Sequence, residues 1–210
     1  MSIDAYETFV LRSTLTSPFG RKVRMAADVL GMAPRITIQP ADYADEHDSL
    51  RQQNPLGKIP CLVRLDGSAV FDSSVIIEFL QHVAGTDRLL PLRGDERIDA
   101  LVQTRLADGI IDAGALVIYE ERYHEPEQRS TRWLDHQRGK IHRVLAAFET
   151  RLPDPQRTTA VSIGLSCSLA FLDKRRPVEW RGQHPRLVDW LETFAAAEPA
   201  FERTRPPVVA

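Results

Sequence analysis

The stretch Asn54–Ser74, NPLGKIPCLVRLDGSAVFDSS, holds the groups whose types and spacing could bind a ligand. Pro60 stands where a loop enters an expected strand, and the backbone at such a strand entry can pair with an extended peptide. Asp72 and Ser73 stand where an apolar-periodic helix begins, and the free N–H groups of a helix start attract a carboxylate. Together these two features predict a site for a short, peptide-like ligand that carries a carboxylate.

Strand, turn and helix signals surround that stretch and define the elements that must position it. The patterns predict strands at Thr8–Ser13, Arg35–Gln39, Cys61–Leu65 and Ala69–Phe71, and helices at Phe19–Leu30 and from Asp72 to near Ala84. An Asp-Gly pair predicts a tight turn between the last two strands. This order of elements predicts a mixed-sheet α/β domain over residues 1–84.

Three details of this first domain follow from the same patterns. The helix Phe19–Leu30 is expected to keep Arg21, Lys22 and Arg24 on its outer side, with Gly31 as its C-cap. The segment Pro40–Gln53 is polar and acidic without a clear period, which predicts a loop with at most one helical turn. Residues 1–7 are expected to form a short overhang.

The rest of the chain predicts an all-helical domain over residues 96–210, after a linker at Gly85–Asp95. Helical periodicity marks Glu96–Arg122, Glu127–Arg151, Ser162–Lys174 and Pro185–Ala197. The third of these segments is almost wholly apolar and is expected to be the buried central helix. The tail runs into two prolines at 206 and 207, where a helix cannot continue.

Composition narrows the function classes. The hydrophobic fraction of 43% and charged fraction of 27% are ordinary for a globular protein, and a net charge of −2 argues against a nucleic-acid partner. No apolar run approaches the ~18 residues of a membrane span. Cys61 and Cys167 are too few for a disulfide framework and are expected to be buried, reduced thiols. A cytoplasmic protein with no membrane association is the expectation.

Three motifs in order, TSPF at 16–19, NPLGKIP at 54–60 and DSS at 72–74, resemble those of the glutathione S-transferase family. The resemblance is strongest over residues 8–84 and continues to the C-terminus. It implies a thioredoxin-like N-terminal domain followed by an all-helical C-terminal domain, with glutathione as co-substrate. It also implies a homodimer, in which the first domain of one subunit meets the helices of the other.

The resemblance assigns roles to the residues of the central stretch. It implies a cis bond before Pro60, and a main-chain contact from Ile59 to the cysteinyl backbone of glutathione. Asp72 and Ser73 would hold the γ-glutamyl end, and Lys58 would reach the glycine carboxylate. Weaker candidates for that carboxylate are Arg51, Gln52 and Gln53.

Ser17 is the candidate catalytic residue, because glutathione transfer needs a thiolate at neutral pH. A free thiol has a pKa of ~8.5, and lowering it to ~6.5 corresponds to roughly 2.7 kcal/mol. A hydroxyl donor together with a helix N-terminus could supply much of that stabilisation. Ser17 precedes a helix that Pro18 begins, so it could also act simply as the N-cap; Thr14 and Thr16 are alternative donors. No cysteine stands at this position, so a mixed disulfide with glutathione is not expected.

Two positions depart from the family pattern. Many relatives carry Glu or Gln where this chain has Asp72, whose shorter side chain implies a longer or water-bridged contact to the ligand amine. The family also has a Ser/Thr-x-x-Asp capping box at its buried helix, whereas Ser162 here is followed by Leu165. The loss of one of the two reciprocal bonds is expected to cost about 1 kcal/mol.

The second substrate is the least defined part of the prediction. A small hydrophobic electrophile is expected to bind between the domains, with candidate contacts at Tyr119, Arg122, Tyr123 and Trp133. His124 and His136 lack partners at metal-site spacing, so no metal site is predicted.

Three functional interpretations use the same site. The leading one is a glutathione transferase; the alternatives are a non-catalytic binding or scaffold protein on this fold and a glutathione-dependent isomerase or peroxidase. Phe71 and Arg64, near the hairpin, are expected to be exposed and could contribute to the dimer contact.

Overall fold

A computed structural model describes residues 7–42 and 45–207, which include two compact units. The first unit comprises the chain up to Arg97 and again from Ala200, and the second comprises Ile98–Pro199. The predicted domain boundaries, 1–84 and 96–210, stay a prediction. Residues 1–6, most of the predicted overhang, lie outside the described part of the chain.

The first unit is built on a mixed sheet of four strands, which confirms the predicted fold class. Its elements are β1 (Phe9–Arg12), α1 (Pro18–Val29), β2 (Ile36–Gln39), α2 (Leu50–Gln53), β3 (Cys61–Val63), β4 (Ala69–Val70) and α3 (Ser73–Val83), with a 3-10 turn at Ala33–Arg35. The sheet order is β2-β1-β3-β4, with β1 and β2 parallel and the other pairs antiparallel. α2 is the single helical turn expected within the polar segment.

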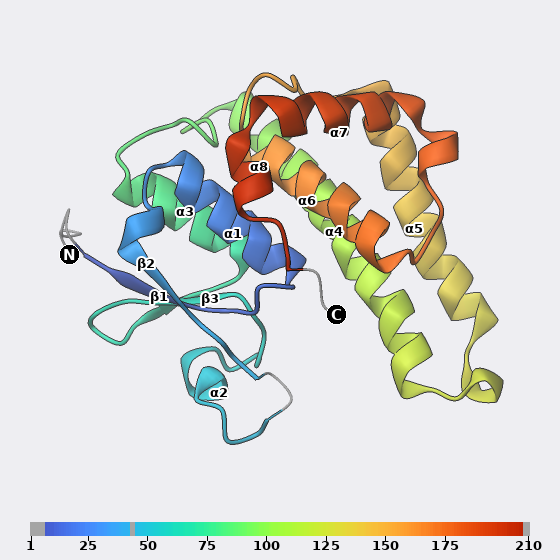
Figure 1. Cartoon of the computed structure of the whole chain (residues 1–210), viewed down its shortest axis with the longest axis horizontal. Coiled ribbons are helices and arrows are strands. Elements are labelled where there is room, and N and C mark those ends of the chain that lie inside the picture. The colour runs from blue at the N-terminus through green and yellow to red at the C-terminus, as the bar shows by residue number, and fades with distance from the viewer. Residues whose placement is uncertain (1–6, 43–44, 208–210) are drawn as a thin grey trace. The chain divides into compact units, whose positions relative to one another are not determined.

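The two faces of this sheet are covered differently, as Figure 1 shows, with α1 and α3 on one side and α2 on the other. The first face buries an apolar cluster of Phe9, Leu11, Val23, Ala27, Met32, Leu62, Ile76 and Leu80. Among the described residues, the cluster buried on the second face is smaller and comprises Ala41, Leu50 and Cys61, with four partly buried apolar neighbours. The alternation of side chains along β3 explains the division, because Leu62 points to one face and Cys61 to the other.

The prediction that three basic residues lie on the outer side of α1 is wrong for two of them. Arg21 and Lys22 are 3% and 0% exposed, and at Arg21 the chain that returns from Ala200 lies against α1. Arg21 donates from Nη2 to the carbonyl of Phe201 at 2.6 Å, and its guanidinium lies over the ring of that residue. The returning chain is fixed further by an ion pair between Arg203 and Asp28.

The expectation of an overhang is also wrong at its last residue. The Glu7 side chain is buried, and both of its carboxylate oxygens accept hydrogen bonds from Arg64, at 3.0 and 2.9 Å. Arg64 and Phe71 are therefore not the exposed pair that the sequence suggested. Both are partly buried, and Phe71 packs under the second face of the sheet.

The second unit is helical, as predicted. Its elements are α4 (Asp95–Tyr123, from Ile98 onward), α5 (Thr131–Thr150), α6 (Ala160–Arg175) and α7 (Pro185–Ala197), with 3-10 turns at Pro126–Gln128 and Arg181–Gln183. α6 is the buried central helix, and the Ser168 hydroxyl donates to the carbonyl of Ala107 in α4 at 2.7 Å. A short last helix, α8 (Pro199–Arg203), belongs to the first unit from Ala200 onward and ends before the two prolines of the tail. No helix of the described residues is long and apolar enough to cross a membrane.

The capping box predicted to be missing from the buried helix is present, so that prediction is wrong. The N-cap is Thr159, three residues earlier than Ser162. The backbone N–H of Thr159 donates to Ser162 Oγ at 2.8 Å, and the N–H of Ser162 donates to Thr159 Oγ1 at 3.3 Å. Ser162 therefore takes the place of the acidic residue at the third helical position, and both reciprocal bonds form.

Candidate functional site

The strand directions bring the predicted site residues to one edge of the sheet. Arg12, the last residue of β1, lies opposite Cys61, the first of β3, and Val70 at the end of β4 lies opposite Leu62. β1 and β4 therefore end at the edge where β3 begins. Ser17 follows β1, Pro60 precedes β3 and Asp72 follows β4, so all three leave the sheet from this shared edge.

Ser17 occupies the N-cap of α1, and its Oγ accepts a hydrogen bond from the Gly20 N–H at 3.1 Å. A serine hydroxyl has one donor and two acceptor positions, and this cap uses one acceptor position only. Among the described residues no acceptor is recorded for its O–H. The helix-capping and thiolate-binding roles that the sequence left open are thus compatible.

Gly20 fixes how closely the start of α1 approaches the end of β1. A Cβ at this position would lie 2.1 Å from Ser13 Oγ, and Ser13 itself is buried. Only glycine permits that approach without displacing Ser13. The absence of a side chain at Gly20 therefore sets the position of Ser17 relative to the sheet.

The alternative donors Thr14 and Thr16 contact one another. Their hydroxyl oxygens lie 3.3 Å apart and form a hydrogen bond in which either can donate. One of their two hydroxyl protons is committed to this bond. The Ser17 proton has no such competing bond among the described residues.

The loop before β3 has the predicted cis bond at Ile59–Pro60; the Phe71–Asp72 bond is also cis. Ile59 is partly buried, and Lys58 is exposed. The carbonyl of Lys58 accepts a hydrogen bond from Asn54 Nδ2 at 2.7 Å, so the loop backbone is anchored while the lysine side chain reaches solvent.

Asp72 and Ser73 occupy different positions at the start of α3. Asp72 is the N-cap, and its Oδ1 accepts from the N–H groups of Ser74 and Val75 at 3.0 and 3.4 Å. Ser73 is the first helical residue, and no partner is recorded among the described residues for its N–H or its hydroxyl. An N–H and an O–H at a helix start are suited to bind a carboxylate.

Sequence reasoning missed Arg12, whose buried guanidinium lies beneath the 40–53 segment. Its Nη atoms donate to Ser49 Oγ, Gln53 Oε1 and Asp48 Oδ1 at 2.7, 2.8 and 2.6 Å. Two features of the sequence could have indicated this network. Arg12 ends an otherwise apolar strand, and an Asp-Ser pair directly before Leu50 supplies acceptors for it. The backbone N–H groups of Asp42 and Leu50, together with Arg12, hold the pKa of the Asp48 carboxyl below its usual range.

The cysteine next to the cis proline is unsuited to thiolate chemistry. Cys61 is fully buried, and burial raises the pKa of its thiol to about 11, although the charge of Arg12 acts in the opposite direction. Cys167 is a buried free thiol in the second unit. Reduced, buried thiols were expected at both positions.

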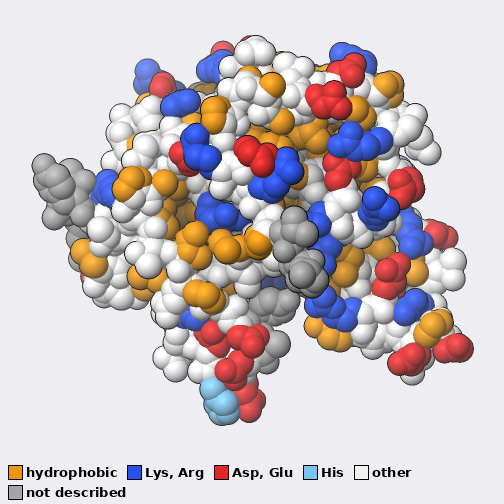
Figure 2. Space-filling view, in the orientation of Figure 1, with side chains coloured by type: hydrophobic (Ala, Val, Ile, Leu, Met, Phe, Trp, Pro, Cys, Tyr) orange, Lys and Arg blue, Asp and Glu red, His pale blue; other side chains and the backbone are white. Residues whose placement is uncertain are grey.

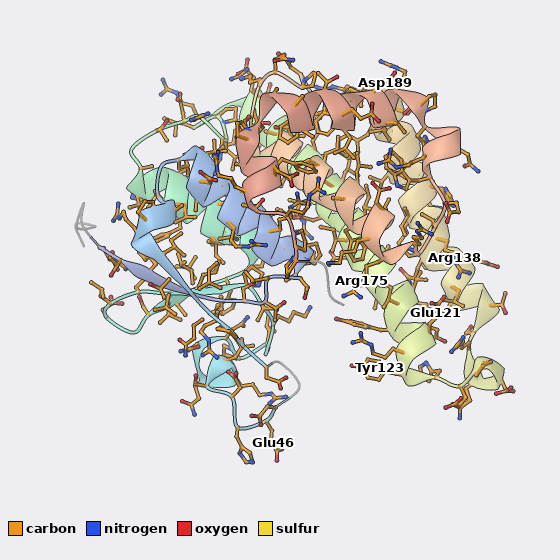
Figure 3. The ribbon with its side chains drawn as sticks, in the orientation of Figure 1. Glu46, Glu121, Tyr123, Arg138, Arg175 and Asp189 are labelled. Carbon is orange, nitrogen blue, oxygen red and sulfur yellow. The ribbon has the colours of Figure 1, made fainter. Side chains whose placement is uncertain are left out.

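The candidate contacts for a second substrate are exposed on the second unit. Tyr119, Tyr123 and Trp133 are 41%, 67% and 41% exposed, and the two tyrosine rings lie 5.9 Å apart along α4. Figure 3 shows Tyr123 at the end of α4, with Glu121 nearby and Arg138 on α5. Arg122 is exposed as well.

The two histidines considered above as metal ligands contact a carboxylate and an aromatic ring. His124 Nδ1 lies 3.2 Å from Glu120 Oε2, and the ring of His136 stacks on Trp133.

A concavity of about 750 Å³ on the first unit involves none of the predicted site residues. It lies at the C-terminal end of α3 and is lined by Glu78, Gln81, His82, Gly85, Thr86, Asp87, Leu92 and Arg97.

Comparison with known proteins agrees with the fold. Residues 16–83 match the glutathione S-transferase N-terminal domain, and residues 131–193 match the glutathione S-transferase C-terminal domain. The chain is 34% identical over 202 residues to the uncharacterized GST-like protein YibF of Escherichia coli K12. That alignment covers 94% of this chain and 98% of YibF. The chain therefore belongs to the glutathione S-transferase family.

Two solved structures with bound glutathione or a derivative are similar over nearly the whole chain. A glutathione transferase family member from Pseudomonas fluorescens Pf-5, with bound glutathione, is 36% identical with a TM-score of 0.89. The match covers 96% of this chain and 100% of that one. A glutathione S-transferase from Methylobacterium radiotolerans, in complex with glutathione sulfonate, is 31% identical with a TM-score of 0.85. It covers 97% of each chain.

Proposed function

We propose that this protein is a glutathione transferase of the serine type, which attacks a small hydrophobic electrophile with the glutathione thiolate. The observation that carries the proposal is the shared sheet edge, from which Ser17, Pro60 and the start of α3 all leave. Relatives of 31 to 36% identity that are solved with glutathione or its sulfonate support the choice of ligand.

In the proposed complex the ligand lies along the entry to β3. The main chain of Ile59 pairs with the cysteinyl backbone, and the cis Pro60 directs the chain into the strand. Ser73 binds the γ-glutamyl carboxylate through its uncommitted N–H and hydroxyl, and Asp72 faces the ligand amine. Lys58, exposed on the loop, reaches the glycine carboxylate.

The proposed chemistry requires a stabilised thiolate. The Ser17 O–H donates to the glutathione sulfur while its oxygen continues to cap α1. The N-terminus of α1 adds a favourable field for negative charge. The sulfur then forms a bond to the electrophilic carbon, and the leaving group departs with the electron pair of the bond that breaks.

The expected assembly is a homodimer in the cytoplasm. An apolar stripe on α4 supports the partner assignment. Ile98, Val102 and Leu106 recur at four-residue spacing and are 60%, 54% and 36% exposed. Such a stripe on one helix face is suited to pack against a second copy. The reducing cytoplasm suits both glutathione chemistry and the two free cysteines.

The test is a pH titration of the thiol of bound glutathione in the wild type, Ser17→Ala, Ser17→Thr and Thr16→Ala. The bound thiol should have a pKa below ~8.5 in the wild type and near ~8.5 in Ser17→Ala. Ser17→Thr should restore the lower value because it retains the hydroxyl, and Thr16→Ala should leave it unchanged. An unaltered pKa in Ser17→Ala would remove Ser17 from the mechanism. Binding without turnover of any electrophile, peroxide or isomerisable substrate would indicate a binding module instead.

A further inference from the structure

A single buried guanidinium connects β1 to four residues of the 40–53 segment between β2 and β3. The side chain of Arg12 is 3% exposed. Besides its bonds to Asp48, Ser49 and Gln53, its Nη2 donates to the carbonyl of Pro40 at 3.4 Å. The acceptors span both ends of the 40–53 segment. The planar fork of arginine, unlike a lysine ammonium, can bind several such acceptors in fixed directions.

Asp48 extends this network into the backbone of the segment. Its Oδ2 accepts from the N–H of Asp42 at 2.9 Å, and its Oδ1 accepts from the N–H of Leu50 at 2.7 Å as well as from Arg12. Acidic side chains gather over α2 and the loop before it (Figure 2), and Figure 3 places Glu46 at the outer tip of this region. Arg12 supplies a positive charge beneath this acidic surface.

The end of α2 is bonded in turn to the loop that enters β3. Asn54 is buried, and its N–H donates to the carbonyl of Leu50 at 2.7 Å. Its side-chain Nδ2 donates to the carbonyl of Lys58, and its Oδ1 accepts from the N–H of Leu56 at 3.1 Å. The N–H of Gly57 donates to the Asn54 carbonyl at 2.8 Å. The residue adjoining Ile59 is therefore connected through Asn54 and α2 to Arg12.

We propose that Arg12 is a positioning residue for glutathione binding, which holds the backbone of Ile59 in place through α2 and Asn54 without contacting the ligand. This inference rests on the proposed function of the site. A tripeptide that binds by backbone pairing needs its partner strand fixed in advance, since ordering a loop on binding reduces the affinity. The apolar cluster under α2 is small, so directional bonds from Arg12 must supply most of that order.

The test compares Arg12→Met with a matched control, Arg64→Met. Both changes remove an arginine from a largely buried ion pair of the first unit, but Arg64 bonds Glu7 rather than the 40–53 segment. Arg12→Met should raise the Kd of glutathione about 10-fold, because the loop must then be ordered on binding. KM for glutathione should rise likewise, while kcat and the pKa of the bound thiol stay unchanged. Arg64→Met should lower thermal stability without this change in Kd.

A second measurement separates the inference from the proposed function. Amide hydrogen exchange at Leu56 and Gly57, in protein without glutathione, should be faster in Arg12→Met than in Arg64→Met. Ser49→Ala, which removes one acceptor of Arg12, should show a smaller change in the same direction and serves if Arg12→Met does not fold. Absence of glutathione binding in the wild type would overturn the proposed function while the exchange comparison still tests the network. Equal exchange and equal Kd in the Arg12 or Ser49 variants and the Arg64 control would overturn the role of Arg12.

Discussion

The two faces of the first unit's sheet are held by different kinds of interaction. The face under α1 and α3 is an apolar cluster, whose non-directional burial tolerates small shifts of its members. The face under α2 has a small apolar cluster and the Arg12 network, whose hydrogen bonds have fixed lengths and directions. The comparison suggests that the first face supplies most of the stability, and the second supplies the geometry of the candidate glutathione site.

The largest expected effect comes from replacing one buried leucine by alanine on each face of the sheet. Leu62 and Leu50 are 0% and 1% exposed on opposite faces. Leu62→Ala should lower the free energy of unfolding by about 2 to 5 kcal/mol, and Leu50→Ala should lie at or below the lower end of that range because its cluster is smaller. Glutathione affinity of the folded protein should fall in Leu50→Ala only. Chemical denaturation and calorimetric titration measure the two quantities, and a reversed pattern would contradict the division of roles.

A smaller effect is expected in the second unit, at the capping box of α6. Ser162→Ala should lower the free energy of unfolding by about 1 kcal/mol, since it removes the bond from the Thr159 N–H. Ser162→Asp should retain the box. Ser166→Ala, which removes a hydroxyl on the same helix from outside the box, is the matched control. Glutathione affinity should not change in any of the three, and a change would show that the site depends on this helix.

The loss of unfolding free energy at acidic pH should depend in part on Asp48. Because its pKa is lowered in the folded state, its contribution is present above its ordinary value near 3.8 and is lost as the pH falls through the folded pKa. Asp48→Asn should therefore flatten the dependence of unfolding free energy on pH below about 4. Asp66→Asn is a useful comparison, since Ser68 lowers the pKa of that carboxyl in an exposed turn away from α2. Equal slopes in the wild type and Asp48→Asn would contradict the Asp48 network.

The smallest expected effect concerns the reactivity of the Cys61 thiol in the native protein. Cys61 lies under α2 with a thiol pKa of about 11, so alkylating reagents should not label it in the native protein near neutral pH. Arg12→Met should make labelling measurable by mass spectrometry, because α2 then opens more often. Rapid labelling of the wild type would show that α2 does not cover this face.

The sequence predicted the elements that repeat a pattern and missed the contacts that join distant segments. The strand and helix of Phe9–Val29 and the helix at Pro185–Ala197 followed from apolar periodicity and a proline start. The burial of Arg21 depends on a chain segment 180 residues away, which no local pattern records. Ser162 was assigned to the wrong half of its capping box, because a serine can serve either position.

The candidate site shows the same limit. Ser17, Pro60 and Ser73 stood out because each begins or precedes a regular element. Arg12 did not, because its acceptors in the 40–53 segment lie within a stretch without period. The hydrogen bonds to Ser49 and Gln53 that place it beside α2 join residues 37 and 41 positions apart, which no local pattern records.

A structure of the protein with bound glutathione would test the proposed binding site most directly. The sulfur should lie within hydrogen-bonding distance of Ser17 Oγ, the cysteinyl backbone should pair with the main chain of Ile59, and the γ-glutamyl carboxylate should bind Ser73. Glutathione bound elsewhere, or with its sulfur directed away from the start of α1, would contradict the proposed site.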